Sequence, residues 1–230
     1  MVDIWQGLAG QLAPLRCQFC AAPGTAGLPL CTACRADLPW NRHACPRCAL
    51  PQNHDAVCAA CAERPPPFVA AWAPLRLETP VQQQIHALKY DAAFIHARVL
   101  GQLFAAAWRE RGGPRPDLII PVPLHPRRLW RRGYNQSVEL ARMLARDEGL
   151  RVEANGATRQ RRTADQIGMS AVERRRNVKG AFRVDAQVDG LRVALLDDVM
   201  TTGATLGELA RACLKAGASE VEAWAIARVA

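Results

Sequence analysis

The sequence predicts an α/β domain with a mainly parallel sheet, preceded by a small cysteine-rich module. Strand-type segments alternate with helix-type segments after residue 68, and this alternation favours a parallel sheet covered by helices. The apolar run 193–196 lacks polar alternation, as expected of a strand that is buried on both faces. Before residue 65, eight of the nine cysteines form four Cys-x-x-Cys pairs.

The chain is expected to divide into three parts. Apolar residues at helical spacing predict a short helix over residues 1–16. The cysteine pairs occupy residues 17–64, and a stiff segment with three prolines, 63–67, marks the end of this module. The main domain then spans residues 65–230.

Within the main domain the expected elements follow in order. Strands are predicted at residues 69–77, 117–123, 193–196 and 220–228, and helices at 81–90, 93–109, 137–147 and 205–215. A polar stretch over residues 155–179 has little apolar periodicity.

Two carboxylates and a small-residue turn follow the apolar run. Asp197 and Asp198 are neighbours, so on a strand their side chains point to opposite sides, and their oxygens suit sugar hydroxyls or a cation. Thr201 to Thr205 then lead into a helix, whose first amides have no internal partner and favour an anion. Gly203 lets the backbone approach a phosphate closely. The segment therefore predicts a sugar-phosphate site where open α/β sheets bind ligands.

The cysteine module is an internal duplication, because the pair that starts at Cys17 recurs at Cys45. Two tight knuckles can supply four thiolates to one tetrahedral Zn²⁺, so the module predicts two structural zinc ions. Pairing within each repeat is favoured over a cross-braced arrangement. A disulfide scaffold is the alternative, and it requires an oxidising compartment. The candidate zinc ligands are Cys17, Cys20, Cys31, Cys34, Cys45, Cys48, Cys58 and Cys61.

The charge of the chain points to an anionic partner. A net charge of +9 and a pI near 9.5 favour phosphates or nucleic acid. No secretion signal and no apolar span are visible, so we expect a soluble cytoplasmic protein without membrane insertion.

Arginines gather in three clusters, at residues 125–136, 159–162 and 174–176. The first cluster follows the end of a predicted strand as a loop, and aromatic residues are interleaved with its cations. Cations neutralise phosphates and aromatic faces stack on bases, which predicts a single-stranded nucleic-acid surface. For the third cluster a solvated helix face is an equal alternative. The candidate nucleic-acid contacts are Arg127, Arg128, Trp130, Arg131, Arg132 and Tyr134.

Residues 197–205 closely resemble the phosphoribosyl pyrophosphate (PRPP) motif of type I phosphoribosyltransferases, and nearly the whole chain resembles the ComF family (competence protein F, GntX-like). The cysteine module fits this family. The motifs that carry the resemblance are Pro121 to Leu124, Arg132 to Gln136, Thr163 to Gln166, Arg174 to Phe182 and Asp197 to Gly203. Ala164 and Asp165 depart from the usual pattern in the segment where type I enzymes contact their specific substrates.

The resemblance implies a type I phosphoribosyltransferase fold and a role in handling incoming single-stranded DNA during natural transformation. It implies that Asp197 and Asp198 are catalytic carboxylates that hold the ribose hydroxyls, with Mg²⁺ accompanying the pyrophosphate. Residues 155–180 would form a mobile lid with the pyrophosphate contacts Arg161, Arg162 and Lys179. The implied PRPP-binding residues are Thr201, Thr202, Gly203, Ala204, Thr205, Val122, Pro123, Leu124 and His125.

Three functions stay open at this point. The first is a PRPP-binding protein that handles single-stranded DNA, with proteins of the DNA-uptake machinery as further partners. The second is an active enzyme that transfers phosphoribosyl from PRPP to a nitrogenous acceptor. The third is an adaptor that acts through the zinc module alone. No pocket specific for an acceptor base is visible in the sequence.

Overall fold

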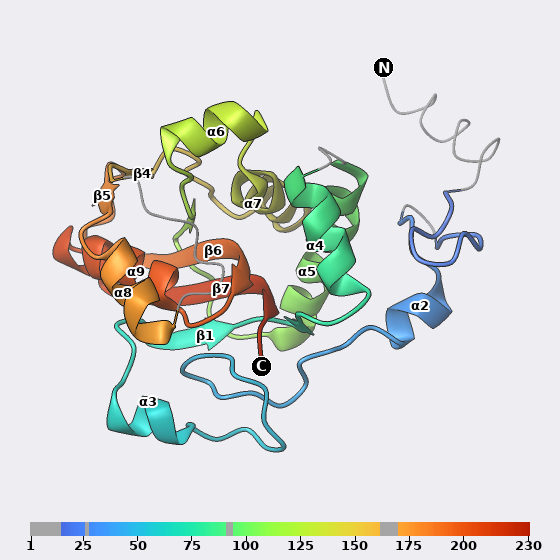
Figure 1. Ribbon diagram of the computed structural model, residues 1–230, viewed down its shortest axis with the longest axis horizontal. Helices are drawn as coiled ribbons and strands as arrows, with labels where there is room; N and C mark the ends of the chain where they lie inside the picture. Colours follow the sequence, from blue (N-terminus) through green and yellow to red (C-terminus); the bar gives the residue numbers. More distant parts are fainter. Residues whose placement is uncertain (1–14, 26–27, 91–93, 162–169) are drawn as a thin grey trace.

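The computed structural model describes residues 15–25, 28–90, 94–161 and 170–230, so the helix expected over residues 1–16 lies almost entirely outside the described residues. The main sheet has five strands, and all of its pairings are parallel. Its order is β1-β7-β6-β3, and β2 extends the same edge by pairing with β7. Strands β1, β6 and β7 are labelled in Figure 1. The strands are β1 (Ala70–Trp72), β2 (Leu75–Arg76), β3 (Leu118–Pro121), β6 (Arg192–Met200) and β7 (Glu220–Arg228).

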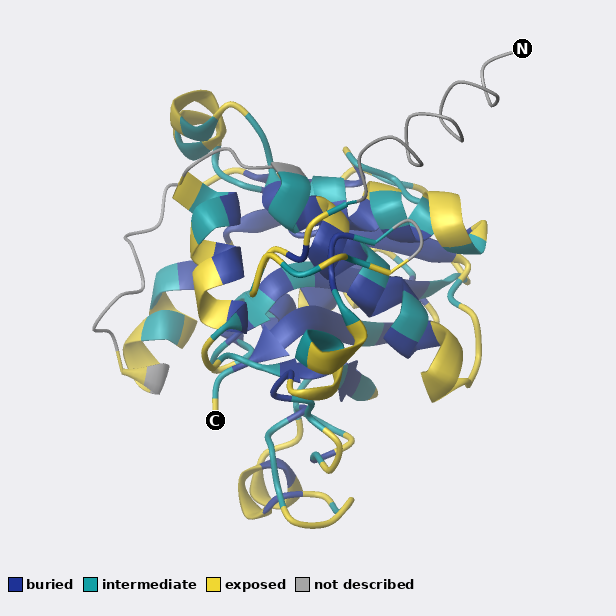
Figure 2. Cartoon of the chain, turned by 90° about the vertical axis from the view of Figure 1, so that its right-hand side faces the viewer, coloured by how far each residue is buried: buried dark blue, intermediate teal, exposed yellow. Residues whose placement is uncertain are grey.

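Helices cover both faces of this sheet. One face packs against α4 (Val81–Tyr90), α5 (Phe94–Arg111) and α7 (Gln136–Glu148). The other face packs against α9 (Ala204–Lys215), which is itself covered by α8 (Ala171–Val178). Strand β6 contributes to the hydrophobic core on both faces of the sheet. Ala194 and Leu196 pack on the side of α4, α5 and α7, and Val193 and Leu195 pack on the side of α9. The expected strand buried on both faces is therefore confirmed, and buried residues gather in these central layers (Figure 2).

Several elements differ from the sequence expectation. The strand that carries the two carboxylates runs to Met200 instead of ending at Leu196, so both carboxylates lie within it. The segment expected as one strand over residues 69–77 is divided into β1 and β2 at Pro74, which has no N–H to donate. The polar stretch contains a strand, β4 (Ala157–Arg159), which pairs antiparallel with β5 (Phe182–Val184) just after the stretch.

The arginine-rich segment expected as a loop forms a helix, α6 (Pro126–Arg132). His125 accepts a hydrogen bond from the Arg127 N–H at 3.2 Å, and Pro126 takes the first helical position, where its missing N–H costs nothing. Gly133 ends the helix with a φ of 82°. The local capping residues explain why this charged segment is helical.

The cysteine module contains the short helices α2 (Thr32–Ala36) and α3 (Ala59–Glu63), and it is anchored to the β1 edge of the sheet. The Ala71 N–H donates to the Pro46 carbonyl at 3.0 Å, and the Arg76 N–H donates to the Pro39 carbonyl at 2.8 Å. In the described part of the chain, no helix has the length and apolar composition needed to cross a membrane.

Candidate functional site

The turn between β6 and α9 has the backbone conformation expected of a phosphate-binding turn. Gly203 precedes α9 with a φ of 72°, a region that residues with a Cβ atom rarely adopt. The Thr202 hydroxyl accepts a 3.4 Å hydrogen bond from the Ala204 N–H. The first amides of α9 are thus presented at the carboxyl end of the central strand, where an anion is favoured.

A pocket of about 320 Å³ lies in front of this turn. The turn itself contributes Thr201, Gly203, Ala204 and Thr205 to the lining, and the end of β6 contributes both carboxylates. The other described residues that line the pocket come from the segments after β3, from α4, from α6 and α7, and from the polar stretch. They include Lys89, Tyr90, Val122, Leu124, Arg128, Arg131, Arg132, Gln136, Arg159 and Arg174.

Asp197 is bound to the start of α7. One of its carboxylate oxygens, Oδ1, accepts from the Ser137 hydroxyl at 3.1 Å and from the Asp198 N–H at 2.9 Å. Burial and the charge of Asp198 raise the pKa of Asp197 to about 7, although Lys89 and the hydrogen bonds oppose the shift. This carboxyl group can therefore exchange a proton near neutral pH.

Asp198 turns to a different partner. The residue is 4% exposed, and its Oδ2 atom lies 2.8 Å from the Nζ atom of Lys89, at the end of α4. Burial opposes the charged ammonium, but the two neighbouring carboxylates raise the pKa of Lys89 above its ordinary value. Asp198 and Lys89 therefore form a largely buried ion pair in the lining of the pocket. The two neighbouring aspartates have separate partners, in agreement with the expected opposite orientation.

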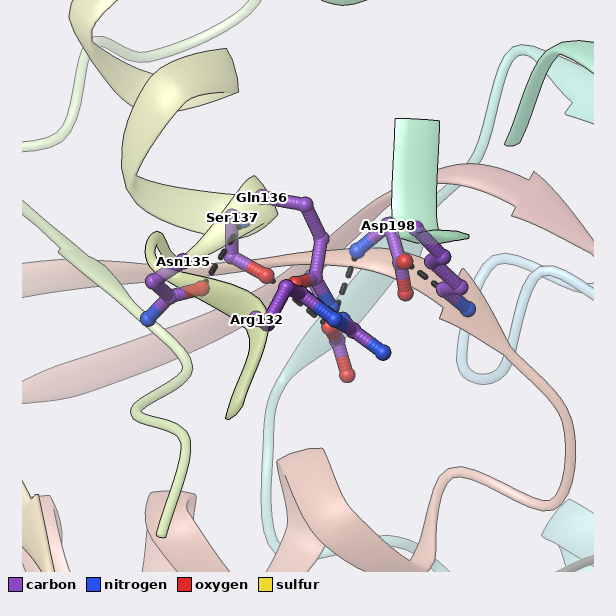
Figure 3. A network of polar contacts seen from close by, with 7 residues as sticks. Arg132, Asn135, Gln136, Ser137 and Asp198 are labelled. Carbon is purple, nitrogen blue, oxygen red and sulfur yellow. Dashed lines mark hydrogen bonds and ion pairs between the residues drawn. The ribbon is translucent and has the colours of Figure 1, made fainter. Parts of the chain in front are cut away.

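The loop and helix beside the carboxylates are fixed by side-chain hydrogen bonds (Figure 3). Asn135 caps α7 by accepting from the Ser137 N–H at 3.0 Å, and its amide donates to the Val122 carbonyl at 3.0 Å. Arg132 donates to Gln136 at 2.6 Å. The guanidinium of Arg132 also lies 5.6 Å from the ring centroid of Tyr90, a cation–π contact. These contacts join α4, α6 and α7 around one opening.

The polar stretch supplies two guanidinium groups to the pocket, those of Arg159 and Arg174. Arg159 is 5% exposed and lies 5.4 Å from the ring centroid of Phe182. Burial, together with the charges of Arg128 and Arg161, lowers the pKa of Arg159 to about 10. Burial and the nearby positive charges both disfavour the charged form of this guanidinium. A bound anion would offset both effects, so the position of Arg159 favours an anionic ligand.

The structure gathers many of the candidate PRPP-binding residues, but several have other surroundings. Val122 and Leu124 line the pocket, whereas the ring of His125 caps α6. Thr202 lines a second cavity behind the turn instead of the pocket. Pro123 is buried.

Of the proposed lid contacts, Arg161 donates to the carbonyls of Asn177 and Lys179, at 2.8 and 2.7 Å. Its guanidinium therefore holds the end of α8. Lys179 is exposed at that end, and Arg162 lies outside the described residues.

The candidate nucleic-acid residues also separate into groups. Arg128, Arg131 and Arg132 line the pocket, and Arg127 is exposed beside them on α6. Trp130 is 88% exposed. Tyr134 is half-buried and packs against the α4, α5 and α7 core, so its ring is less open to a base than that of Trp130.

Sequence reasoning missed Lys89, Tyr90 and Gln136 as site residues. Lys89 is one of only three lysines among 30 basic residues, and it ends a predicted helix, which is the only signal that the sequence offered. Which helix end lies beneath the carboxylates depends on the tertiary fold.

The eight paired cysteines form two clusters, Cys17, Cys20, Cys31 and Cys34, and Cys45, Cys48, Cys58 and Cys61. Within each cluster the sulfur atoms lie within 4.8 Å of one another, as one tetrahedral zinc ion requires. The pairing is therefore sequential within each repeat, as favoured by the sequence.

Backbone N–H groups support thiolates in both clusters. Although burial opposes the shift, N–H donors lower the pKa of Cys17 to about 6 and that of Cys45 to about 7, whereas hydrogen bonding to Cys20 raises the pKa of Cys34 and burial raises that of Cys61. The residues therefore fit two structural zinc ions. Four thiolates on each ion leave no open position for catalysis.

Known proteins resemble both the cysteine module and the chain as a whole. Residues 8–62 match the double zinc ribbon domain family. DNA utilization protein YhgH of Salmonella typhi is 37% identical over 221 residues, which cover 94% of this chain and 97% of that protein. Competence protein F of Haemophilus influenzae is 38% identical over 156 residues, which cover 65% of this chain and 68% of that protein. The chain belongs to the ComF family.

The more distant competence protein ComFC of Bacillus subtilis is 26% identical over 86% of this ComF-family chain and 84% of its own length. Among solved structures, a purine phosphoribosyltransferase from Pyrococcus horikoshii is 16% identical, covers 57% of this chain and 84% of its own, and has a TM-score of 0.35. The allosteric regulatory enzyme of purine biosynthesis is 24% identical with a TM-score of 0.36, over 54% of this chain and 24% of its own.

The predicted fold class is confirmed for this ComF-family protein. A double zinc ribbon precedes an α/β domain with a parallel sheet.

Proposed function

We propose that the pocket binds PRPP together with Mg²⁺, and that the protein uses this pocket in handling single-stranded DNA in the cytoplasm during DNA uptake. One observation carries the proposal. A single pocket of about 320 Å³ combines a helix N-terminus, two carboxylates and several guanidinium groups. A sugar that carries a phosphate at one end and a pyrophosphate at the other matches this set.

Each part of PRPP has a suitable partner. The turn offers backbone N–H groups to the 5′-phosphate, and Thr201 and Thr205 offer hydroxyls. The carboxylates at the end of β6 suit the ribose hydroxyls. The guanidinium groups of Arg132, Arg159 and Arg174 suit the pyrophosphate, because planar forks bind phosphate oxygens in pairs.

Magnesium also fits the donor set. Mg²⁺ takes oxygen ligands and commonly binds through one or two carboxylates and the phosphates of its substrate. Because Lys89 already holds Asp198, we assign the metal contact to Asp197 and the pyrophosphate. Bound there, the ion would neutralise charge on the pyrophosphate.

The single-stranded DNA part of the proposal rests on α6. This helix places Arg127 and Arg131, together with the exposed ring of Trp130, beside the mouth of the pocket. Guanidinium groups neutralise the DNA backbone, and an exposed indole can stack on a base. The names of the relatives, DNA utilization protein and competence protein, support the same role.

Isothermal titration of the full chain with PRPP and Mg²⁺ tests the proposed ligand. We expect saturable binding, weakened about tenfold or more by Asp198→Asn, since a charged hydrogen-bond acceptor is lost. Asp147→Asn, on the outer side of α7, is the matched control and should bind as the wild type does. Absence of binding at millimolar PRPP would overturn the proposal.

Phosphoribosyl transfer to a nitrogenous acceptor is the second candidate, and one observation favours it. In this candidate Asp197 acts as a base and does not contact the metal, because its pKa is raised to about 7, which suits a group that accepts a proton from an attacking nitrogen. PRPP consumption with purines, pyrimidines, amines and oligonucleotides tests this candidate. Binding without consumption of PRPP would leave the pocket as a binding site only.

A further inference from the structure

The second zinc cluster (Cys45, Cys48, Cys58 and Cys61) lies behind the phosphate turn. A cavity of about 420 Å³ separates the two, and residues of both line it. The cluster contributes Cys48, Cys58 and Cys61, and the turn contributes Thr202, Gly203 and Ala204. The turn therefore has the ligand pocket in front and the second zinc cluster at its back.

Arg228, the last residue of β7, connects these two sides. It is 7% exposed, and its Nε atom donates to the carbonyl of Cys48 at 2.9 Å. Its Nη1 atom donates to the carbonyl of Met200 at 3.3 Å and also to the carbonyl of Val229. Met200 is the residue directly before the phosphate turn. One side chain thus joins a cysteine knuckle to the end of the strand that carries the turn.

The position suits an arginine in particular. A guanidinium presents several donors in a fixed planar fork, so it can bridge two carbonyls that a lysine or glutamine cannot span in the same geometry. A buried cation also needs negative charge nearby. Four thiolates around one Zn²⁺ carry a net charge of −2, so the loaded cluster supplies that charge next to Arg228.

The segment that leaves the second cluster also supports the turn. It runs from α3 through the prolines to Phe68, which belongs to the core beneath α9. A Cβ atom on Gly203 would lie 3.8 Å from Phe68, and one on Gly207 would lie 3.6 Å from Pro67. The backbone of the turn and of the first turn of α9 therefore packs directly on this segment.

From these contacts we infer that Arg228 is a positioning residue that ties the second zinc centre to the phosphate turn. Zinc in that centre fixes the Cys48 knuckle, the knuckle fixes the guanidinium, and the guanidinium fixes the end of β6. Loss of zinc there loosens the turn and weakens binding of its anionic ligand. The ligand part of this inference rests on the proposed function, whereas the ordering of the turn does not.

Amide hydrogen exchange, measured on the ligand-free full chain, tests the ordering directly. In Arg228→Gln we expect faster exchange over residues 200–206, with two zinc ions still bound per chain by native mass spectrometry. Arg211→Gln is the matched control, because Arg211 lines the same cavity but bonds to Glu208 and not to the cluster. Unchanged exchange at the turn in Arg228→Gln would overturn the inference.

Selective loss of the second zinc provides the complementary test. Cys58→Ser should release one zinc ion and speed exchange at the turn, and it should add little in the Arg228→Gln background, since the connection is already broken. Equal effects of Cys58→Ser in both backgrounds would contradict the inference. If Arg228→Gln does not fold, Arg228→Lys takes its place, because it keeps the charge but loses the fork.

Binding of PRPP with Mg²⁺ is the functional readout. We expect Arg228→Gln to bind roughly tenfold more weakly, the effect of losing charge-assisted hydrogen bonds that hold the site. Wild-type affinity in Arg228→Gln would overturn the functional part of the inference. If the wild type binds no PRPP, the proposed ligand is wrong, and the exchange data still decide the role of Arg228.

Discussion

The Nζ atom of Lys89 lies 2.8 Å from the Oδ2 atom of Asp198, and this pair joins the end of α4 to the end of β6 in the lining of the candidate ligand pocket. Lys89 is 24% exposed and Asp198 only 6% at the side chain. Attraction between the two charges offsets their desolvation only while both are present. The pair therefore determines how the second carboxylate of the motif is held.

Removal of one partner should destabilise the fold more than removal of both. We expect Lys89→Met or Asp198→Asn alone to lower the free energy of unfolding by about 2 kcal/mol, below the range for fully buried pairs because Lys89 is partly exposed. The double variant should lie closer to the wild type than the sum of the two changes. Urea denaturation of all four proteins measures this coupling, and strict additivity would contradict it.

The raised pKa of Asp197 predicts that the stability of the folded protein depends on pH. Its pKa rises from 3.8 to about 7, so between these values the folded protein holds a proton that the unfolded chain has released. This contribution to stability is complete below pH 3.8 and is lost as the pH rises through 7. The melting temperature of the wild type should therefore fall relative to that of Asp197→Asn over this range.

Asp185→Asn serves as a control of opposite sign. The hydrogen bond from Thr158 lowers the pKa of Asp185, so its contribution is lost only as the pH falls through that lowered value. A difference between wild type and Asp197→Asn that stays constant from pH 4 to 7 would show that Asp197 titrates normally.

Gly203→Ala should harm both the fold and the ligand site. With a φ of 72°, a Cβ atom at this position costs about 1 kcal/mol in the free energy of unfolding, and it also shifts the amides that face the pocket. Gly190→Ala is the matched control, because Gly190 has a φ of 68° but lies outside the pocket lining. Both variants should lose similar stability in denaturation, and only Gly203→Ala should weaken PRPP binding in titration.

The zinc pairing can be tested by counting metal ions. Sequential pairing predicts that Cys20→Ser combined with Cys34→Ser removes one of two zinc ions, because both residues belong to the first cluster. In a cross-braced arrangement the same double variant would damage both sites. Native mass spectrometry distinguishes one remaining ion from none.

The exposed residues of α6 predict two distinguishable contributions to DNA binding, one from charge and one from stacking. Arg131→Gln should weaken binding to single-stranded DNA and reduce the slope of log affinity against log salt by about 0.7, since one phosphate contact is lost. Trp130→Ala should weaken binding with little change in slope, because stacking involves no counterion release. Arg142→Gln on α7 is the control. Unchanged affinity in both α6 variants would exclude this surface.

The sequence by itself determined much of this protein. Four Cys-x-x-Cys pairs at hairpin spacing favoured two zinc sites, because the spacing places thiolates where a metal needs them, whereas the pairing of the four pairs was decided by the fold. The apolar run, the two aspartates and Gly203 identified a buried strand and its turn, since periodicity and backbone conformation are local properties.

Only the tertiary structure decided which residues meet at that turn. Lys89 and Arg159 are distant in sequence from the carboxylates, and their burial next to those charges depends on how α4 and the polar stretch pack. Arg228 reads as the ordinary end of a strand until the fold places Cys48 beside it. The turn between β6 and α9 is a local sequence motif, but the site around it is completed by contacts between distant segments. Periodicity and spacing cannot specify such contacts.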